Sequence, residues 1–365
     1  MKIKDVTKFL ESIAPLSYQE SYDNSGLIIG DLENEISGVL VSLDITEAVI
    51  DEAIRKKTNL VVAHHPLIFK GLKKINGSNY VEKTVIKAIK NDIAIYAIHT
   101  NLDNVANGVN FKIAEKLGLK NIKILAPKSQ TLMKLTVFVP QESTGKLLDA
   151  LYNAGAGEIG NYSHCSFRTE GKGTFKPNHL ANPFIGKVGY LEEVEESRIE
   201  VVFPSYLKNQ VLKGMQSGHP YEEISYYLHL LENQNLAVGS GAIGDLPREM
   251  DITHFLPYLK EKLRLKVIKY TESQRNKLKK IAICGGVGSF LLNEVKRTGA
   301  DVFITSDYKY HEFFDAENQI IIADIGHFES EQFTKDLLVE NISKKFINFA
   351  TYLSEIDTNP IKYYY

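Results

Sequence analysis

The stretch "TNLVVAHHPLIFKG" (Thr58–Gly71) places two adjacent histidines directly after an apolar run. The run Leu60–Ala63 is typical of a buried strand, and Pro66 follows His64 and His65. Neighbouring side chains on a strand point to opposite faces, but two imidazoles can converge where the strand turns into a loop. The stretch therefore predicts a buried strand with a functional site at its carboxyl end.

Apolar runs alternate with amphipathic segments on both sides of this stretch. Continuous apolar strands that alternate with helices are typical of a mostly parallel sheet covered on both faces, so we expect an α/β fold. The predicted strands are Gly38–Asp44, Asn59–His65, Ile93–Asp103, Lys279–Cys284, Ala300–Asp307 and Gln319–Asp324. The predicted helices are Glu47–Lys57, Val81–Asp92, Val109–Leu119, Leu291–Gly299 and a segment from about Phe328.

The character of the sequence changes after Pro127. "KLTVFVP" (Lys134–Pro140) is echoed by "RIEVVFP" (Arg198–Pro204), each is followed by a helix-like segment, and Ile224–Glu232 is a further β-like stretch. This pattern predicts an inserted ferredoxin-like β-α-β-β-α-β domain over residues 128–233. The expected host is a discontinuous metal-binding α/β domain over residues 1–127 plus 234–365, since loops tolerate insertions at low entropic cost.

Composition limits the class of protein. The chain has 365 residues, which favours two domains, and its net charge of -2 predicts no strong attraction to a phosphate backbone. Two cysteines, Cys165 and Cys284, suit neither a disulfide framework nor a thiolate metal site. We find no apolar run of membrane-spanning length and no signal-peptide pattern, and we expect a cytoplasmic protein without membrane contact.

Ionisable residues follow the predicted strands of both flanks. The carboxyl ends of parallel strands share one edge of the sheet, where ligands collect. In "DIGHFESEQF" two such residues are four positions apart, on one face of a predicted helix. Three imidazoles and two carboxylates exceed the needs of one catalytic zinc but suit two ions bridged by a carboxylate. The candidate metal ligands are His64, His65, Asp103, His327 and Glu331.

Other residues in these positions are candidates for supporting roles. Nitrogen and oxygen donors without thiolate favour zinc foremost, with manganese, iron, cobalt or nickel as alternatives. Residues expected to orient the ligands by hydrogen bonds are Asp44, His99, Asp307 and His311. The candidates for proton transfer are Glu331, His99 and His311.

Simpler interpretations of the same residues remain open. Asp44 and Asp324 could only cap the helices that follow their strands, and His99 could bond to the backbone in the core. The His-x-x-x-Glu pair could lie on the surface. The glycines of "GGVG" (Gly285–Gly288) predict a tight strand–helix turn first and a phosphate or base contact second, because they lack a full dinucleotide or P-loop fingerprint.

Six motifs occur in the order of the GTP cyclohydrolase I type 2 homolog family, which the chain resembles over nearly its whole length. They are "YDNSGLIIG" (Tyr22–Gly30), "SLD" (Ser42–Asp44), "AHHPLIF" (Ala63–Phe69), "HTNLD" (His99–Asp103), "TSDYKYHE" (Thr305–Glu312) and "DIGHFESE" (Asp324–Glu331). "LANPFIG" (Leu180–Gly186) and "GHPYEE" (Gly218–Glu223) resemble the long bacterial form, in which a PII/CutA-like domain interrupts the α/β domain. Ser306-Asp307 stands where the family usually has Gly-Asp, which puts the tightness of that turn in doubt.

The resemblance implies a dinuclear metal centre on the five candidate ligands, with two divalent ions per subunit. It also implies a homohexamer, built as a toroid of stacked trimers or a trimer of dimers, with the metal sites facing an internal cavity. The expected function is metal-dependent hydrolysis like that of a GTP cyclohydrolase, in which metal-bound hydroxide opens a purine imidazole ring or performs a related hydrolysis on a small-molecule, nucleotide-like substrate.

Two further functions compete with hydrolysis. One is a non-enzymatic scaffold that senses a metal or metabolite through the PII-like insert. The other is single-stranded nucleic-acid binding in the cavity of the toroid, through "KGLKK" (Lys70–Lys74) and the interleaved Tyr308, Lys309 and Tyr310, which could serve stacking and phosphate contacts. The net charge of -2 makes nucleic acid the less favoured partner.

Overall fold

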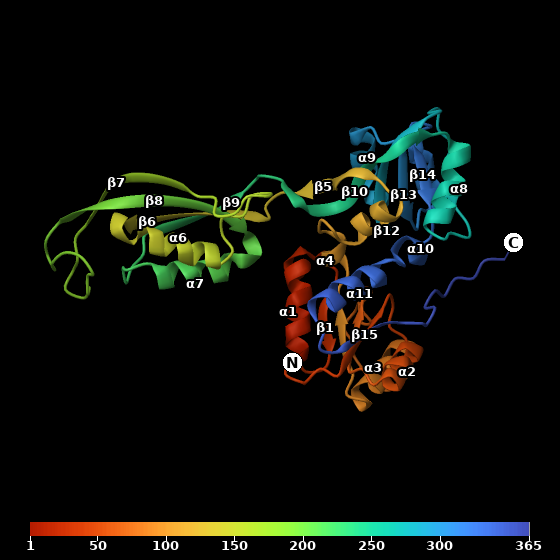
Figure 1. The fold of residues 1–365 in the computed structure, drawn as a ribbon, viewed down its shortest axis with the longest axis horizontal. Coiled ribbons are helices and arrows are strands. Elements are labelled where there is room, and N and C mark those ends of the chain that lie inside the picture. The colour runs from red at the N-terminus through yellow and green to blue at the C-terminus, as the bar shows by residue number, and fades with distance from the viewer. Residues whose placement is uncertain (365) are drawn as a thin grey trace. The chain divides into compact units, whose positions relative to one another are not determined.

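A computed structural model of the chain describes residues 1–364. The chain forms two compact units, one made of residues 1–127 and 236–365 and the other of residues 128–235 (Figure 1). The first unit is therefore built from two separate stretches of sequence. Tyr365, the last of the three C-terminal tyrosines, lies outside the described residues.

The first sheet of the discontinuous unit has five strands in the order β1-β4-β3-β2-β15. The strands are β1 (Gly26–Ile29), β2 (Gly38–Ser42), β3 (Leu60–Ala63), β4 (Ala94–Ala97) and β15 (Ala350–Leu353). All neighbours are parallel except β1 and β4. Ala63 is in register with both Ser42 and Ala97, so β2, β3 and β4 end level with one another. The residues that follow these three strands therefore emerge at one edge.

A second sheet lies in the same unit, so the prediction of one mostly parallel sheet is wrong in its detail. Its order is β11-β14-β13-β12-β10-β5. The strands β12, β13 and β14 are parallel to one another, whereas β10 is antiparallel to β12 and β11 is antiparallel to β14. The strands are β5 (Lys120–Lys128), β10 (Asn235–Met250), β11 (Lys269–Tyr270), β12 (Leu278–Val287), β13 (Val302–Ser306) and β14 (Ile321–Asp324). Apolar runs reveal strands but not their partners, which explains the error.

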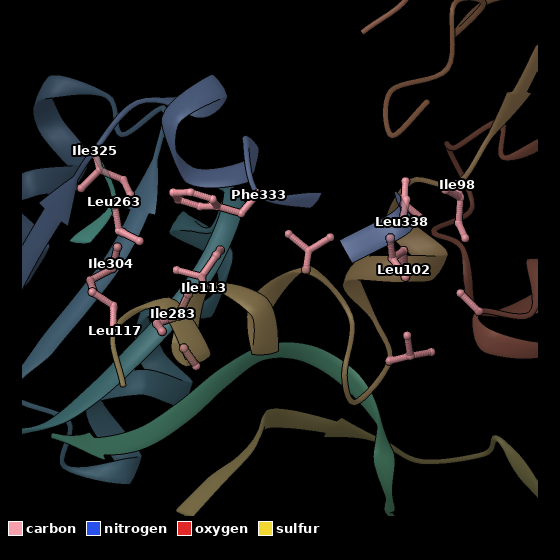
Figure 2. Packing of buried hydrophobic residues seen from close by; sticks show 14 of the residues in the cluster. Ile98, Leu102, Ile113, Leu117, Leu263, Ile283, Ile304, Ile325, Phe333 and Leu338 are labelled. Carbon is pink, nitrogen blue, oxygen red and sulfur yellow. The ribbon is translucent and has the colours of Figure 1, made fainter. Parts of the chain in front are cut away.

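One apolar core joins the two sheets of this unit. It contains Val62 of β3. Figure 2 shows Leu102 of α4, Ile113 of α5, Ile283 of β12 and Phe333, which lies between α10 and α11. The helices are α1 (Ile3–Ile13), α2 (Glu47–Lys56), α3 (Tyr80–Lys90), α4 (Thr100–Asp103), α5 (Val109–Lys116), α8 (Ile252–Lys262), α9 (Leu292–Thr298), α10 (His327–Glu331) and α11 (Thr334–Lys345). Among residues 1–364, no helix has the length and apolar character needed to cross a bilayer.

The prediction of a single strand over Ile93–Asp103 is wrong. The strand β4 ends at Ala97, and after His99 the chain turns into the short helix α4. The backbone N–H of Thr100 donates to Asp23 Oδ2 at 3.0 Å, so a distant carboxylate binds a free amide of the first helical turn. The contact joins residues 77 positions apart, so hydrophobic periodicity could not reveal it, and the helix it caps places Asp103 Oδ1 3.6 Å from His64 Nε2 at the end of β3.

The contiguous unit has the element order β-α-β-β-α-β. Its four strands pair in the order β7-β8-β6-β9, and all neighbours are antiparallel. The elements are β6 (Leu132–Pro140), α6 (Thr144–Asn153), β7 (Phe167–Phe175), β8 (Glu192–Pro204), α7 (Lys208–Gly218) and β9 (Tyr226–Leu231). Its own core includes Leu135, Leu147, Phe203 and Met215, so both helices pack on the sheet.

A buried histidine at the end of α7 predicts that acid destabilises this unit. Burial lowers the pKa of His219 from its ordinary value of 6.5, and the ring bonds as a neutral imidazole. Its Nε2 donates to the carbonyl of Phe138 at 2.8 Å, and its Nδ1 accepts from the backbone N–H of Tyr221 at 3.0 Å. Below the ordinary pKa the unfolded chain binds a proton that the folded unit resists, so stability should fall as pH drops below about 6.5.

Hydrogen exchange of the β6 and α7 amides at pH 7.5 and 5.5 would measure this loss. A His219→Gln variant keeps one donor and one acceptor but cannot titrate, so its protection should respond less to pH. Equal pH dependence in the variant and the natural chain would contradict the assignment.

Candidate metal centre

His64 is the most enclosed of the candidate ligands. Its side chain is fully buried, and its Nδ1 lies 2.9 Å from the carbonyl oxygen of Ile98. A carbonyl can only accept, so Nδ1 carries the proton and Nε2 presents a lone pair. That Nε2 lies 3.6 Å from Asp103 Oδ1 and 3.8 Å from Glu331 Oε2. Both His64 Nε2 and Asp103 Oδ1 are buried and have no hydrogen-bond partner among residues 1–364. Buried polar atoms without partners are costly, and a cation would satisfy both.

His65 is held between two carboxylates. Its Nδ1 lies 2.7 Å from Asp44 Oδ1 and its Nε2 lies 2.8 Å from Glu331 Oε2. Burial would lower the pKa of His65, but the hydrogen bonds to Asp44 and Glu331 raise it to about 10. Asp44 itself accepts from Thr358 Oγ1 at 2.6 Å. A carboxylate behind a histidine fixes the ring orientation and makes its other nitrogen a better metal ligand.

His327, which begins α10 just after β14 of the second sheet, also lies between two carboxylates. Its Nδ1 lies 2.5 Å from Asp307 Oδ2, and its Nε2 lies 3.2 Å from Glu331 Oε2, one turn further along α10. Burial opposes protonation of His327, but hydrogen bonds to Glu331 and Asp307 raise its pKa to about 9. His327 and Glu331 therefore share a face of α10, as their spacing predicted.

Glu331 is the point on which the histidines converge. Only 2% of the residue is exposed, and its Oε2 faces Nε2 of His64, His65 and His327. Burial would raise its pKa, but these imidazoles hold the pKa well below the ordinary value. Asp103, by contrast, has a pKa raised to about 8 by burial and by the negative charge of Glu331. Two acids buried together in this way favour a bound cation.

The donor atoms divide into groups that suit metal binding. The ligand atoms of His64, Asp103 and Glu331 lie within 4.8 Å of one another, and so do those of His65, His327 and Glu331. Two donors on one tetrahedral zinc at about 2.0–2.2 Å are roughly 3.3–3.5 Å apart. The separations of 3.2 Å, 3.6 Å and 3.8 Å are close to that value, whereas His65 Nε2 and Glu331 Oε2, 2.8 Å apart, are at hydrogen-bond distance. The group of His64, Asp103 and Glu331 therefore has the donors and the spacing for a divalent cation, and the group of His65, His327 and Glu331 has the donors. Glu331 is common to both.

His99 lies beside these groups and bonds to Asp23, a residue that was not among the predicted site residues. Its Nδ1 lies 2.7 Å from Asp23 Oδ1, and its ring lies 5.2 Å from that of His64 and 5.4 Å from that of His65. Burial would raise the pKa of Asp23, but hydrogen bonds from His99 and Thr100 hold it well below the ordinary value. Asp23 belongs to the family-like motif "YDNSGLIIG", and this membership could have marked it as a candidate site residue.

Some predicted residues lie elsewhere. His311 is exposed, and its ring contacts are with Tyr310 and Phe314, so the structure does not bring it to the other candidates. Asp324 is buried and pairs with Lys269 at 2.6 Å, which is a structural role. Tyr308 is only 5% exposed, so its proposed stacking on nucleic-acid bases is wrong.

The backbone at the glycines near the end of β12 lies close to Glu331. Gly286 has a φ of +66°, and a Cβ there would lie 2.5 Å from Glu331 Oε1. The N–H of Gly285 donates to Asn110 Oδ1 at 2.8 Å, and the N–H of Gly286 donates to Ser330 Oγ at 3.0 Å. This geometry agrees with the first interpretation, a tight turn, and leaves Glu331 room beside the backbone.

A cavity of about 740 Å³ opens beside these residues, lined by His65, His99, Asp103, His327 and Glu331 among others. The segment Thr358–Ile361 forms part of its wall. The cavity lies within the discontinuous unit, so a molecule in it would reach the candidate metal ligands directly.

Comparison with known proteins places the chain among close relatives. The profile of the family described as Duf34/NIF3 (NGG1p interacting factor 3) matches residues 1–360. A Bacillus subtilis protein named "GTP cyclohydrolase 1 type 2 homolog" is 40% identical over 367 residues, which cover 99% of this chain and 98% of the relative.

Solved structures agree with these matches. A Bacillus cereus protein related to NIF3 has a TM-score of 0.87 at 40% identity, covering 100% of this chain and 99% of its own. A Staphylococcus aureus protein has a TM-score of 0.79 at 32% identity, with the same coverage. The likeness therefore extends over both units of the chain.

Proposed function

Because the chain belongs to the Duf34/NIF3 family, we propose that it is a metal-dependent hydrolase with a dinuclear centre. The observation that carries the proposal is the convergence of three Nε2 atoms on one buried carboxylate, with each Nδ1 anchored to an acceptor. One ion would be held by His64, Asp103 and Glu331, and the other by His65, His327 and Glu331. Zinc suits these donors best.

Two bound divalent ions would polarise an electrophilic carbon and make water acidic enough to attack it near neutral pH. His99 is the residue that moves a proton in this proposal. Its Nδ1 is held by Asp23 at 2.7 Å, which leaves Nε2 free to accept a proton and return it to the leaving nitrogen. Glu331 is occupied by the histidines and is therefore a ligand in this scheme rather than a base.

The reaction proposed is the hydrolytic opening of a purine imidazole ring or a related ring hydrolysis. A first water would add at the carbon between the two ring nitrogens, and one carbon–nitrogen bond would break to leave a formamide. A second water would release formate and an amine. The name of the Bacillus subtilis relative, GTP cyclohydrolase 1 type 2 homolog, supports this choice of reaction.

Formate release from guanosine and GTP by zinc- and manganese-loaded protein would test the proposal. We expect turnover that is lost in Glu331→Ala and His64→Ala and kept in His254→Ala, which removes a histidine whose side chain is 78% exposed. Equal formate from the natural chain and the Glu331→Ala variant would refute hydrolysis at this centre.

A second candidate function is metabolite sensing by the contiguous unit, which we propose to be a PII/CutA-like domain. A cavity of about 560 Å³ lies on its sheet, with Phe138, Phe175, Phe184 and Tyr221 in the wall. Charged residues such as Lys172, Glu196 and Arg198 also line it, so aromatic faces and polar groups that could orient a small molecule occur together. Thermal shifts of the full chain with a nucleotide panel, lost in Tyr221→Ala without loss of turnover, would support sensing.

A further inference from the structure

The cavity at the candidate metal centre is unusual in its charge. Its wall contains four carboxylates, those of Glu20, Asp44, Asp103 and Glu331. Over residues 1–364, its lining includes no lysine and no arginine. Two divalent cations would balance the four carboxylates and leave the cavity without net positive charge.

Among its protein groups the cavity offers a polyphosphate few partners. Proteins hold phosphates with arginine, lysine, free backbone N–H groups at glycine-rich turns, or bound divalent ions. In the proposed hydrolysis the two ions act on the ring carbon and the attacking water, which leaves the protein groups to hold a phosphate. The turn after β12 could have served, but the N–H groups of Gly285 and Gly286 already donate to Asn110 and Ser330. The phosphate interpretation of these two glycines is therefore not supported by their hydrogen bonds.

Two lysines that directly follow lining residues in the sequence are not themselves part of the lining. Lys362 follows Ile361, and its Nζ lies 3.2 Å from Asp357. Lys70 follows Phe69.

The cavity wall instead presents aromatic rings. Four of them are well exposed, with exposed fractions of 70% for Tyr22, 53% for Phe69, 66% for Tyr80 and 67% for Phe290. The ring of Phe69 meets that of His99 edge to face, with centroids 5.7 Å apart. Exposed aromatic rings stack on any flat ring without reading its charge.

We propose that this cavity selects its substrate by a flat, uncharged heteroaromatic ring and makes no use of a polyphosphate. The inference rests on the proposed hydrolysis and narrows its substrate class from nucleotides to free bases, nucleosides and similar heterocycles. A nucleoside triphosphate would be bound through its ring alone, with its phosphates in solvent.

Calorimetric titration of the zinc-loaded protein with guanosine and with GTP, in excess magnesium, tests the proposal. We expect the two dissociation constants to agree within about threefold, and the affinity for GTP to change little with salt. Binding of GTP at least tenfold tighter than guanosine, weakened by salt, would overturn the proposal. So would the absence of binding by guanosine, inosine and a neutral pterin alike.

A variant designed to bind GTP more tightly tests the proposal independently. Val287 is 51% exposed in the cavity wall, so Val287→Lys adds the missing cation and should raise the affinity for GTP about tenfold, with guanosine unchanged. Ile347→Lys is the matched control, because Ile347 is 89% exposed and does not line the cavity. An equal gain in both variants would count against a phosphate-free cavity wall.

The binding and formate assays separate the two proposals. Ring binding without any turnover would refute hydrolysis and leave the substrate class standing. Turnover that requires the triphosphate would refute the substrate class and leave hydrolysis standing.

Discussion

Replacing Glu331 with glutamine is expected to lower the affinity for zinc by more than about 100-fold. Loss of a residue that only orients a metal ligand already costs roughly 10–100-fold, and Glu331 is common to both donor groups. The amide removes a buried negative charge and cannot bind two cations with one group. Competition with a chromophoric chelator would measure the affinity, and elemental analysis would give the metal content.

The control for this prediction is Glu340→Gln, which makes the same change on a carboxylate whose side chain is 61% exposed and pairs with Lys112. Its zinc content should equal that of the natural chain. The metal-free Glu331→Gln variant should still fold, since the substitution also removes the charge that raises the pKa of Asp103. Full zinc content in this variant would show that the metal is bound elsewhere.

Replacing Gly286 with alanine is expected to weaken both folding and metal binding. The residue has a φ of +66°, where a side chain costs about 1–2 kcal/mol. A Cβ would also lie 2.5 Å from Glu331 Oε1 and 3.5 Å from His327 Cε1. Because Glu331 must move to relieve this contact, we expect the affinity for zinc to fall about tenfold or more.

Gly299 offers a control that separates the two effects. Its φ is +70°, and a Cβ there would meet no atom within 4 Å. Gly299→Ala should therefore lose a similar free energy of unfolding in chemical denaturation but keep the natural affinity for zinc. Equal zinc affinities in the two variants would mean that Gly286 affects only the backbone.

The candidate ligands could be predicted because their positions are local features of the sequence. His64 and His65 follow an apolar run, and His327 and Glu331 share a helical face. The register of β2, β3 and β4 then brings the first of these to one edge. Ionisable residues placed after apolar runs, or on one face of a helix, were thus enough to find the side chains that the fold brings together.

Asp44 and Asp307, which orient His65 and His327, were found in the same way, but the residues that hold Asp44 and His99 in turn were not. Asp23 bonds to His99 across 76 positions, and Thr358 bonds to Asp44 across 314. Such contacts depend on how distant segments cross, which no local periodicity records. His311 was placed wrongly for the same reason, since proximity in sequence to Asp307 did not bring its ring to the cavity.

The discontinuous unit is built from two stretches of sequence that are synthesised at different times. His64, His65 and Asp103 leave the ribosome 228 or more residues before Glu331, a delay of at least about 11–46 s at roughly 5–20 residues per second. The contiguous unit is complete in the meantime, whereas β2 still waits for its neighbour β15. A nascent chain therefore holds three of the five candidate ligands until residues 327–331 are made, and the proposed metal centre can be completed only after that point.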